Sequence, residues 1–271
     1  MADLKILFPV AVRGWQSAGR HSLAVLLATT ALGGFAAHAV DGTWTGASST
    51  EWTDGTNWTS NPIVPDGTAT FTNTGPNTAD SNGLVTLGSV VFTAAPNAQA
   101  YTVNINDVFL VNGAGISNNS TNAQTFNVGA SMVFQNSSTA SGGTMAVTYN
   151  NTSTISFSNS STAGTAIIVN GGDLEFNDTS SAGSAAITNN ATMNFQDSAT
   201  AGGATITNAA GGFLAFNTSS TAGTATIINN NSLQFTGSSS AGSATITTNN
   251  GKRTLIFRPP HFRDSTILKR C

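Results

Sequence analysis

The chain lacks basic and thiol-bearing residues over almost its whole length. Its 271 residues include nine lysines and arginines, three histidines and one cysteine, and none of these lies between Val40 and Gly251. Ten of the twelve acidic residues do lie there, so this stretch, which we call the body, carries a formal charge of −10 although the whole chain carries −3. The body is therefore an acidic segment between two basic ends.

These absences exclude most catalytic chemistry from the body. Without His, Cys, Lys or Arg there is no Ser-His or Cys-His nucleophile pair, no Schiff-base lysine and no His-ligated metal. An acidic body is also unfavourable for binding nucleic acid or an anionic membrane. We therefore expect no enzyme activity, no cofactor, no metal and no nucleic-acid partner. Disulfides contribute nothing to the body, since it has no cysteine.

The chain also lacks an apolar run long enough to cross a membrane as a helix. The run SLAVLLATTALGGFAA, from Ser22, has about 16 residues and two glycines, whereas a spanning helix needs roughly 20 residues. Cationic residues precede it, and Ala37-His38-Ala39 follows it with the small-x-small form of a signal-peptidase site. We therefore predict that residues 1–39 are a signal peptide, cleaved after Ala39, that exports the chain through the inner membrane.

What the body does contain is a tandem sequence repeat. From Phe157 it divides into units that overlap at phenylalanine: FSNSSTAGTAIIVNGGDLEF, FNDTSSAGSAAITNNATMNF, FQDSATAGGATITNAAGGFLAF, FNTSSTAGTATIINNNSLQF and FTGSSSAGSATITTNN. Their Ala-Gly pairs recur at a nearly constant step, at Ala163, Ala182, Ala201, Ala222 and Ala241. A fixed period of roughly 20 residues indicates a solenoid, in which each unit is too small to bury a core alone and stacks on the next.

Within a unit, apolar residues alternate with polar ones as in a β-strand. The stretches Ala225–Ile227 and Leu233–Phe235 each place two apolar side chains on one face and a polar one on the other. Ser, Thr, Gly and Asn, the usual turn formers, lie between them. We therefore predict an all-β fold, a single-stranded parallel β-helix (β-solenoid) of roughly 19–23 residues per turn with no helix of useful length.

Stacking in register predicts columns of like side chains along the β-helix. Each Ala-Gly pair should form a corner that needs a small residue and often a positive φ. The asparagines at the next corner should form a hydrogen-bonded ladder, as in cross-β packing. The predicted columns include phenylalanines Phe157, Phe176, Phe195, Phe216 and Phe235, isoleucines Ile168, Ile187, Ile206, Ile227 and Ile246, and asparagines Asn170, Asn189, Asn208 and Asn229.

Paired carboxylates are the one catalytic device that the composition leaves open. Asp173 and Glu175 lie at i and i+2 and would share the outward face of one strand. Asp178 and Asp197 follow the phenylalanine of adjacent units, so stacking would bring their carboxylates within about 5 to 7 Å. We expect ordinary solvated surface acids at all four positions, and so predict no catalytic, cofactor or metal residues.

Tryptophan takes the place of the repeat in the first part of the mature chain. Trp44, Trp52 and Trp58 lie within fifteen residues of one another. They could form a sugar-stacking platform, but a solenoid also needs its open end covered, and terminal repeats are usually atypical. We therefore predict a Trp-rich N-terminal cap at residues 40–75 and β-helix repeats at residues 76–251, with the sugar platform as the alternative.

The last segment, residues 252–271, breaks the repeat. With Gly251 it reads GKRTLIFRPPHFRDSTILKRC, and it holds six of the nine basic residues and the only cysteine, Cys271. The abrupt change of composition favours a basic non-repeat tail that arose by frameshift or truncation. A functional basic tail that attracts anionic partners is the alternative.

Together these features resemble a family of exported proteins. The opening GTWTG…STEWTDGTNW…VPDGTATF and the tandem NN-x-x-x-LxF-x-x-x-S-x-AG-x-A-x-I-x-N units are similar to the passenger region of bacterial autotransporters, in particular the passenger-associated strand repeat, over residues 22 to 251. The resemblance implies a β-helical passenger of a Gram-negative bacterium, carried outward by a C-terminal membrane β-barrel. The sequence departs from that family's pattern, because a barrel needs many strands of about ten residues each and only twenty residues follow the last repeat; we therefore expect a passenger fragment without the barrel.

We therefore expect an exported passenger fragment, displayed at the cell surface or secreted, that acts as an adhesin, stalk or structural surface protein. It would be periplasmic if the translocator is missing, and we expect no membrane insertion by this chain itself. Its partner would be a glycan or protein receptor on a host or cell surface, or a second copy, since low charge and in-register strands favour self-association. The alternative function is a carbohydrate-active hydrolase that uses surface carboxylates.

Overall fold

The computed structural model describes residues 39–249 and 253–256, the last four by their backbone alone. Residues 1–38 of the predicted signal peptide, residues 250 and 251 at the end of the predicted repeats, and residues 252 and 257–271 of the predicted tail lie outside the described residues. The described part is all-β, and its one helix is the short 3-10 turn η1 (Gly55–Asn57). The prediction of an all-β parallel β-helix is confirmed.

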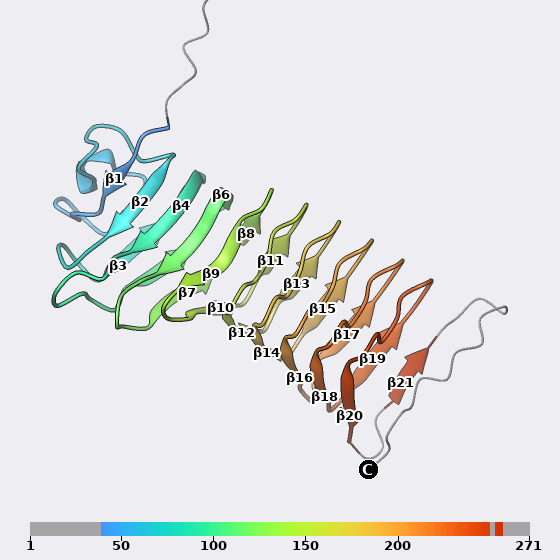
Figure 1. Cartoon of the computed structure of the whole chain (residues 1–271). Helices are drawn as coiled ribbons and strands as arrows, with labels where there is room; N and C mark the ends of the chain where they lie inside the picture. The colour runs from blue at the N-terminus through green and yellow to red at the C-terminus, as the bar shows by residue number, and fades with distance from the viewer. Residues whose placement is uncertain (1–38, 250–252, 257–271) are drawn as a thin grey trace, which may run out of the picture. The chain divides into compact units, whose positions relative to one another are not determined.

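Twelve strands of the described part form one sheet, the long sheet, in which strands from successive turns lie side by side (Figure 1). Every pair in it is parallel, and β9 joins at the side of β6. The strands are β1 (Gly42–Thr43), β2 (Thr68–Phe71), β4 (Val85–Phe92), β6 (Phe109–Asn118), β8 (Ser131–Phe134), β9 (Thr139–Gly143), β11 (Thr154–Phe157), β13 (Asp173–Phe176), β15 (Thr192–Phe195), β17 (Phe213–Phe216), β19 (Ser232–Phe235) and β21 (Arg253–Ile256).

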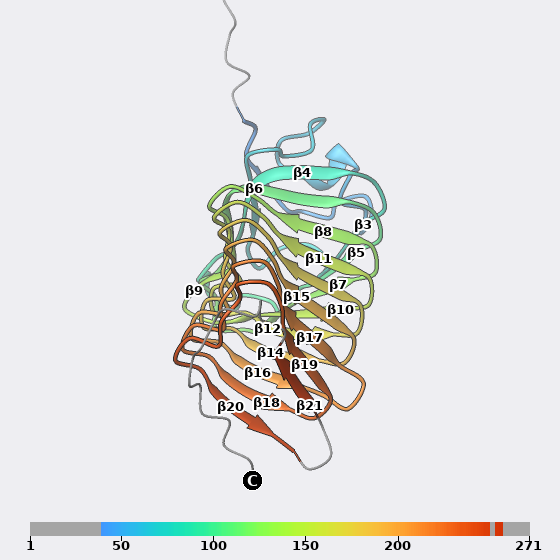
Figure 2. The ribbon, with the colours of Figure 1, turned by 90° about the vertical axis from the view of Figure 1, so that its right-hand side faces the viewer.

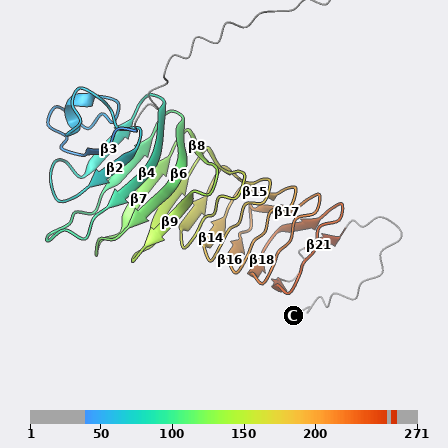
Figure 3. The same cartoon turned by 45° about the horizontal axis from the view of Figure 1, so that its top comes forward.

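Nine strands form the second sheet, the short sheet, which is also parallel throughout (Figure 2). Its strands are β3 (Thr78–Ser81), β5 (Thr102–Ile105), β7 (Gln124–Val128), β10 (Val147–Asn151), β12 (Ile167–Asn170), β14 (Ala186–Asn189), β16 (Thr205–Asn208), β18 (Thr226–Asn229) and β20 (Thr245–Thr248). A third side is joined by single bridges between Thr139, Thr162, Ser181, Thr200, Thr221 and Ser240. Each later turn therefore has three sides, and the turns follow one another in sequence order (Figure 3).

The phenylalanine column is present as predicted, on the inner side of the long sheet. Rings from Phe157 to Phe235 stack face to face, with centroids 4.6 to 4.9 Å apart and interplanar angles of 3 to 8°. This separation equals the distance between neighbouring β-strands. Strand pairing and ring stacking therefore reinforce the same register.

The Ala-Gly corners also have the predicted backbone. Gly183, Gly202, Gly223 and Gly242 have φ between 57 and 62°, the left-handed region that glycine enters without steric cost. A Cβ on any of these four would lie 2.7 Å from the carbonyl oxygen of the glycine in the preceding turn. Glycine is therefore required here both by conformation and by the close approach of two turns.

The predicted asparagine ladder is buried, and it begins one turn earlier than predicted, at Asn151, and extends to Asn229. Each side-chain amide donates to the amide oxygen of the next asparagine, over 2.7 to 2.8 Å between Asn151, Asn170, Asn189, Asn208 and Asn229. The second N–H of the Asn170 amide donates to the Thr192 backbone carbonyl at 2.8 Å. The ladder thus ties Asn170, at the end of β12, to both strands of the next turn, β14 and β15.

A column of inward serines provides a matched test of buried hydrogen bonds. The Ser220 hydroxyl donates to the carbonyls of Asn217 at 2.7 Å and Phe195 at 3.2 Å, whereas the buried Ser180 hydroxyl has no partner. Alanine already occupies the column at Ala199, where it is fully buried. We expect Ser220→Ala to cost about 1 kcal/mol and Ser180→Ala to cost nothing, by urea unfolding. Equal losses in both variants would contradict this account.

Tyr149 should make the protein sensitive to alkali. Its buried hydroxyl donates a hydrogen bond to the Ala140 carbonyl, and burial raises the pKa of Tyr149 well above its usual value. A raised pKa means that this stabilisation is complete below about pH 10, where unfolded tyrosine titrates, and is lost as pH rises through the folded-state value. We expect the free energy of unfolding to fall above about pH 10, less steeply in Tyr149→Phe. If the free energy of unfolding fell equally with pH in the wild type and in Tyr149→Phe, Tyr149 would not be the cause of the sensitivity to alkali.

The tryptophans of the N-terminal region lie in the core. Trp44, Trp52 and Trp58 are all buried, with ring centroids 4.9 to 5.0 Å apart in edge-to-face contacts, and all three pack on Phe71 of β2. The Trp58 indole N–H donates to the Trp52 carbonyl at 2.7 Å. A sugar-stacking platform needs exposed ring faces, so the alternative based on these residues is wrong.

The same region covers the first strand of the short sheet. The Trp52 N–H donates to the Asp80 carbonyl at 2.8 Å, and the Asp80 N–H donates to the Thr50 carbonyl at 2.7 Å. The edge of β3 is therefore paired by the segment around Glu51, which also forms an isolated parallel bridge with Asp80. Covering an edge in this way prevents it from pairing with another chain.

Candidate functional site

The structure places Asp173 and Glu175 on β13, and both side chains point outward as predicted. Register pairs Asp173 with Thr154 and Thr192 on the neighbouring strands. Glu175 is paired with Ser156 and Asn194. These two carboxylates therefore lie among hydroxyl and amide side chains on an open strand face.

Asp178 and Asp197 do lie at the same position of adjacent turns, and both shape a corner. They have φ of 58° and 52°, in a left-handed column that also holds Asn136, Asn159, Thr218 and Gly237. The Asp178 carboxylate accepts a hydrogen bond from the Asn159 N–H at 2.6 Å, and that of Asp197 accepts one from the Asp178 N–H at 3.3 Å. The carboxylates therefore join each corner to the preceding turn. The Asn, Asp and Gly residues that follow successive phenylalanines were the sequence signal for this conformation.

The left-handed column predicts a stabilising substitution at Thr218. This β-branched residue has φ of 57°, a left-handed conformation that costs roughly 1–2 kcal/mol for residues other than Gly, Asn and Asp. We expect Thr218→Asn to stabilise the protein by about 1 kcal/mol, measured by urea unfolding. Thr226→Asn, on the exposed face of β18, is the control and should give no gain. A gain in the control alone would show that left-handed strain is not the cause.

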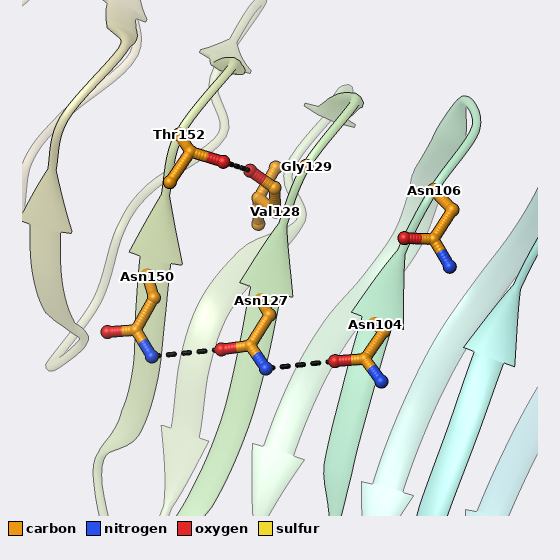
Figure 4. Close-up of a pocket in the computed structure, with 7 residues that line it drawn as sticks. All are labelled: Asn104, Asn106, Asn127, Val128, Gly129, Asn150 and Thr152. Atoms are coloured by element: carbon orange, nitrogen blue, oxygen red, sulfur yellow. Dashed lines mark hydrogen bonds between the residues drawn. The ribbon is translucent and has the colours of Figure 1, made fainter.

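A row of polar side chains crosses the outer face of the short sheet at its N-terminal end. The Asn104 amide donates to the Asp80 carboxylate at 2.7 Å, the Asn127 amide to the Asn104 oxygen at 2.9 Å, and the Asn150 amide to the Asn127 oxygen at 2.9 Å. Figure 4 shows the three amides in line across β5, β7 and β10. On β12 the same position is Val169, so the row ends there.

A second row lies beside the first, at the corner that follows each strand. The Asn106 amide donates to the Asn82 oxygen at 2.8 Å, and the Asn82 amide donates to the Glu51 carboxylate at 2.5 Å. Burial of Glu51 acts to raise its pKa, but hydrogen bonds from Asn82 and Thr53 outweigh burial and hold the pKa below its usual value. Glu51 is thus an ionised anchor at one end of the second row.

The second row is interrupted at Gly129, and a shallow pocket of about 320 Å³ opens there. It is lined by Asn104, Asn106, Asn127, Val128, Gly129, Asn150 and Thr152 (Figure 4). Val128 is fully buried, and the Thr152 hydroxyl donates to its carbonyl at 3.2 Å. Every lining side chain is neutral, so the pocket presents amides and a hydroxyl without charge.

The amide rows and the pocket are not visible as a pattern in the amino-acid sequence, for a physical reason. Asp80, Asn104, Asn127 and Asn150 belong to upstream units that are longer than most of the later units and do not share their regular step. The Asn-rich composition of the chain hides three asparagines at equivalent outward positions. Only the strand register aligns them.

Among the described residues, no helix is long and apolar enough to cross a membrane. The described side chains include no group of three or more His, Cys, Asp and Glu that could hold a metal ion. No protein-family model, curated protein or solved structure matches the chain. The class of the protein is therefore defined by its fold, a parallel β-solenoid.

Proposed function

We propose that the chain is an exported β-solenoid of the autotransporter-passenger type, which serves at the cell surface or outside the cell as a stalk or adhesin and not as an enzyme. The observation that supports this most is the in-register stack itself. Asparagine, serine and aspartate side chains, which a catalyst could use for chemistry, here form hydrogen bonds that join one turn to the next. Such a stack is suited to spacing and display, because each turn contacts only its neighbours.

The test is to produce the full chain in a Gram-negative host and to identify its mature N-terminus by mass spectrometry. Export predicts cleavage after Ala39 and recovery in the periplasm, or at the surface when a translocator is supplied. Ala39→Lys should block cleavage, because signal peptidase needs a small residue there. An unprocessed chain that stays in the cytoplasm would refute export.

A second experiment addresses the hydrolase alternative. Asp178→Asn with Asp197→Asn retains both left-handed corners, since asparagine tolerates a positive φ, and keeps an oxygen to accept the inter-turn hydrogen bonds. The double variant should be as stable as the wild type. Neither protein should hydrolyse any member of a polysaccharide panel. A glycosidase activity that the double variant loses would favour the alternative.

A further inference from the structure

We propose that the amide-lined pocket on β5, β7 and β10 binds a neutral polyhydroxylated chain, a segment of uncharged polysaccharide lying across the strands. The inference rests on the proposed adhesin function and assigns that function a site and a class of ligand. Four observations lead to it, taken from hydrogen-bonding capacity, charge, apolar surface and the glycine at the pocket.

The row of amides has unused hydrogen-bonding capacity on its outer side. A primary amide has two N–H donors and two acceptor positions on its oxygen. Within the row, Asn104 and Asn127 each use one donor and one acceptor. Each therefore retains one donor and one acceptor for a ligand. A sugar hydroxyl is both donor and acceptor, so a run of hydroxyls is the complement of such a row.

The charge of the surroundings selects against ionic ligands. No basic residue lies between Val40 and Gly251, so an anionic ligand would meet no counter-charge. The two rows end at the carboxylates of Asp80 and Glu51, which would repel it. A cationic ligand would find those carboxylates already hydrogen-bonded, Asp80 to the Asn104 amide and to the Thr50 hydroxyl at 2.5 Å. A neutral ligand is what remains.

The pocket also offers too little apolar surface for a hydrophobic ligand. Val128 is the one apolar residue larger than glycine in its lining, and it is fully buried beneath the row. The amides instead repeat at the spacing of neighbouring strands, about 4.8 Å. A repeating polymer of hydroxyl-bearing units can use successive amides, whereas a small polar solute can use only one or two.

Gly129 provides the opening, and the backbone does not require glycine at this position. Its φ lies outside the left-handed region, and a Cβ there would meet the Ile105 oxygen at 3.4 Å and the Asn106 amide oxygen at 3.9 Å, both ordinary contacts. This contrasts with Gly183, where a Cβ would lie 2.7 Å from a backbone oxygen. The absence of a side chain at Gly129 thus leaves space for a ligand and can be tested without damage to the fold.

The experiment titrates the purified full chain with cellohexaose, xylohexaose and mannohexaose by saturation-transfer NMR, and with oligogalacturonate as the anionic probe. We expect at least one neutral probe to bind and oligogalacturonate not to bind. Gly129→Gln should weaken binding at least about tenfold, equivalent to about 1.4 kcal/mol, because it fills the pocket. Ala209→Gln is the matched control, a small residue at the same corner after β16, and should bind as the wild type does.

Asn150→Thr is the second variant, since it removes one amide from the row. It should fold because threonine already occupies this column at Thr207, and it should also weaken binding. The proposal is overturned if no neutral probe binds, if oligogalacturonate binds equally well, or if Gly129→Gln binds unchanged. Binding is measured on purified protein, so failure here is distinct from failure of export, which concerns the location of the chain.

Discussion

Asn189→Asp is expected to destabilise the β-helix by about 4 kcal/mol at pH 7, because it places an uncompensated charge in the buried asparagine ladder. Asn189 is fully buried and makes three hydrogen bonds through its side chain. Its amide donates to Asn208 at 2.8 Å and to the Phe213 carbonyl at 3.0 Å. A carboxylate has no hydrogen to donate, so its oxygens would face two acceptors with no cation nearby.

The pH dependence of the free energy of unfolding of Asn189→Asp shows whether the buried charge or only the altered packing causes the destabilisation. Burial without a cation raises the folded-state pKa of the introduced carboxyl above the value of about 3.9 in the unfolded chain. The penalty should therefore be small at pH below 3.9 or so, where both states are protonated, and should grow as pH rises toward the folded-state pKa. A protonated carboxyl also regains one O–H donor, which replaces part of the amide.

Asn190→Asp is the matched control, since Asn190 is the next residue and is exposed. It should change the free energy of unfolding by less than about 0.5 kcal/mol, as surface substitutions usually do. Both variants are compared with the wild type by urea unfolding between pH 3 and pH 8. A loss in Asn189→Asp that does not vary with pH would mean that the ladder acts through shape alone.

The fold of the repeat region could be predicted from sequence because each unit has the same kind of residue at equivalent positions, and these residues make the same stabilising contacts in every turn. Phe157 and Phe176 are at the same place in adjacent units, and parallel pairing then stacks their rings. The same reasoning placed Asn170 on Asn189. Wherever a residue recurs at the period of the coil, local sequence and long-range contact carry the same information.

The contacts of a residue could not be predicted from sequence where the units differ in length, and its role could not be predicted where that role depends on backbone conformation. Asn104 and Asn127 belong to longer units, so their alignment follows from strand register and not from a visible repeat. From sequence, Asp178 is interpreted as a solvated surface acid. The structure adds its positive φ and the hydrogen bond that its carboxylate accepts from the Asn159 N–H. Residues 253–256 fall within the predicted non-repeat tail, and their backbone pairs with β19 as β21. Parallel pairing is formed by backbone N–H and C=O groups, so β21 can form outside the sequence repeat.

Trp58→Ala is expected to cost about 4 kcal/mol, the usual range for removing a large buried aromatic side chain. Trp58 contacts Trp44, Trp52 and Phe71 through its ring and bonds the Trp52 carbonyl through its indole N–H. Truncation would therefore leave a cavity among three aromatic rings and an unpaired carbonyl. Trp58→Phe keeps a ring in place and should cost less, about 1–2 kcal/mol, from the lost hydrogen bond and volume.

The part of the molecule that Trp58→Ala destabilises is as informative as the size of the decrease in stability. A solenoid is stabilised by contacts between neighbouring turns, so the damage should be greatest in the tryptophan region and in β2 and β3, and should fade along the stack. Hydrogen exchange should show faster exchange at Thr68–Phe71 and Thr78–Ser81, with little change from β14 onward. Because the segment around Glu51 covers the edge of β3, the variant should also self-associate, as light scattering would detect. Uniformly faster exchange along all turns would instead mean that the β-helix unfolds as one cooperative unit and that the tryptophan cluster is not a local cap.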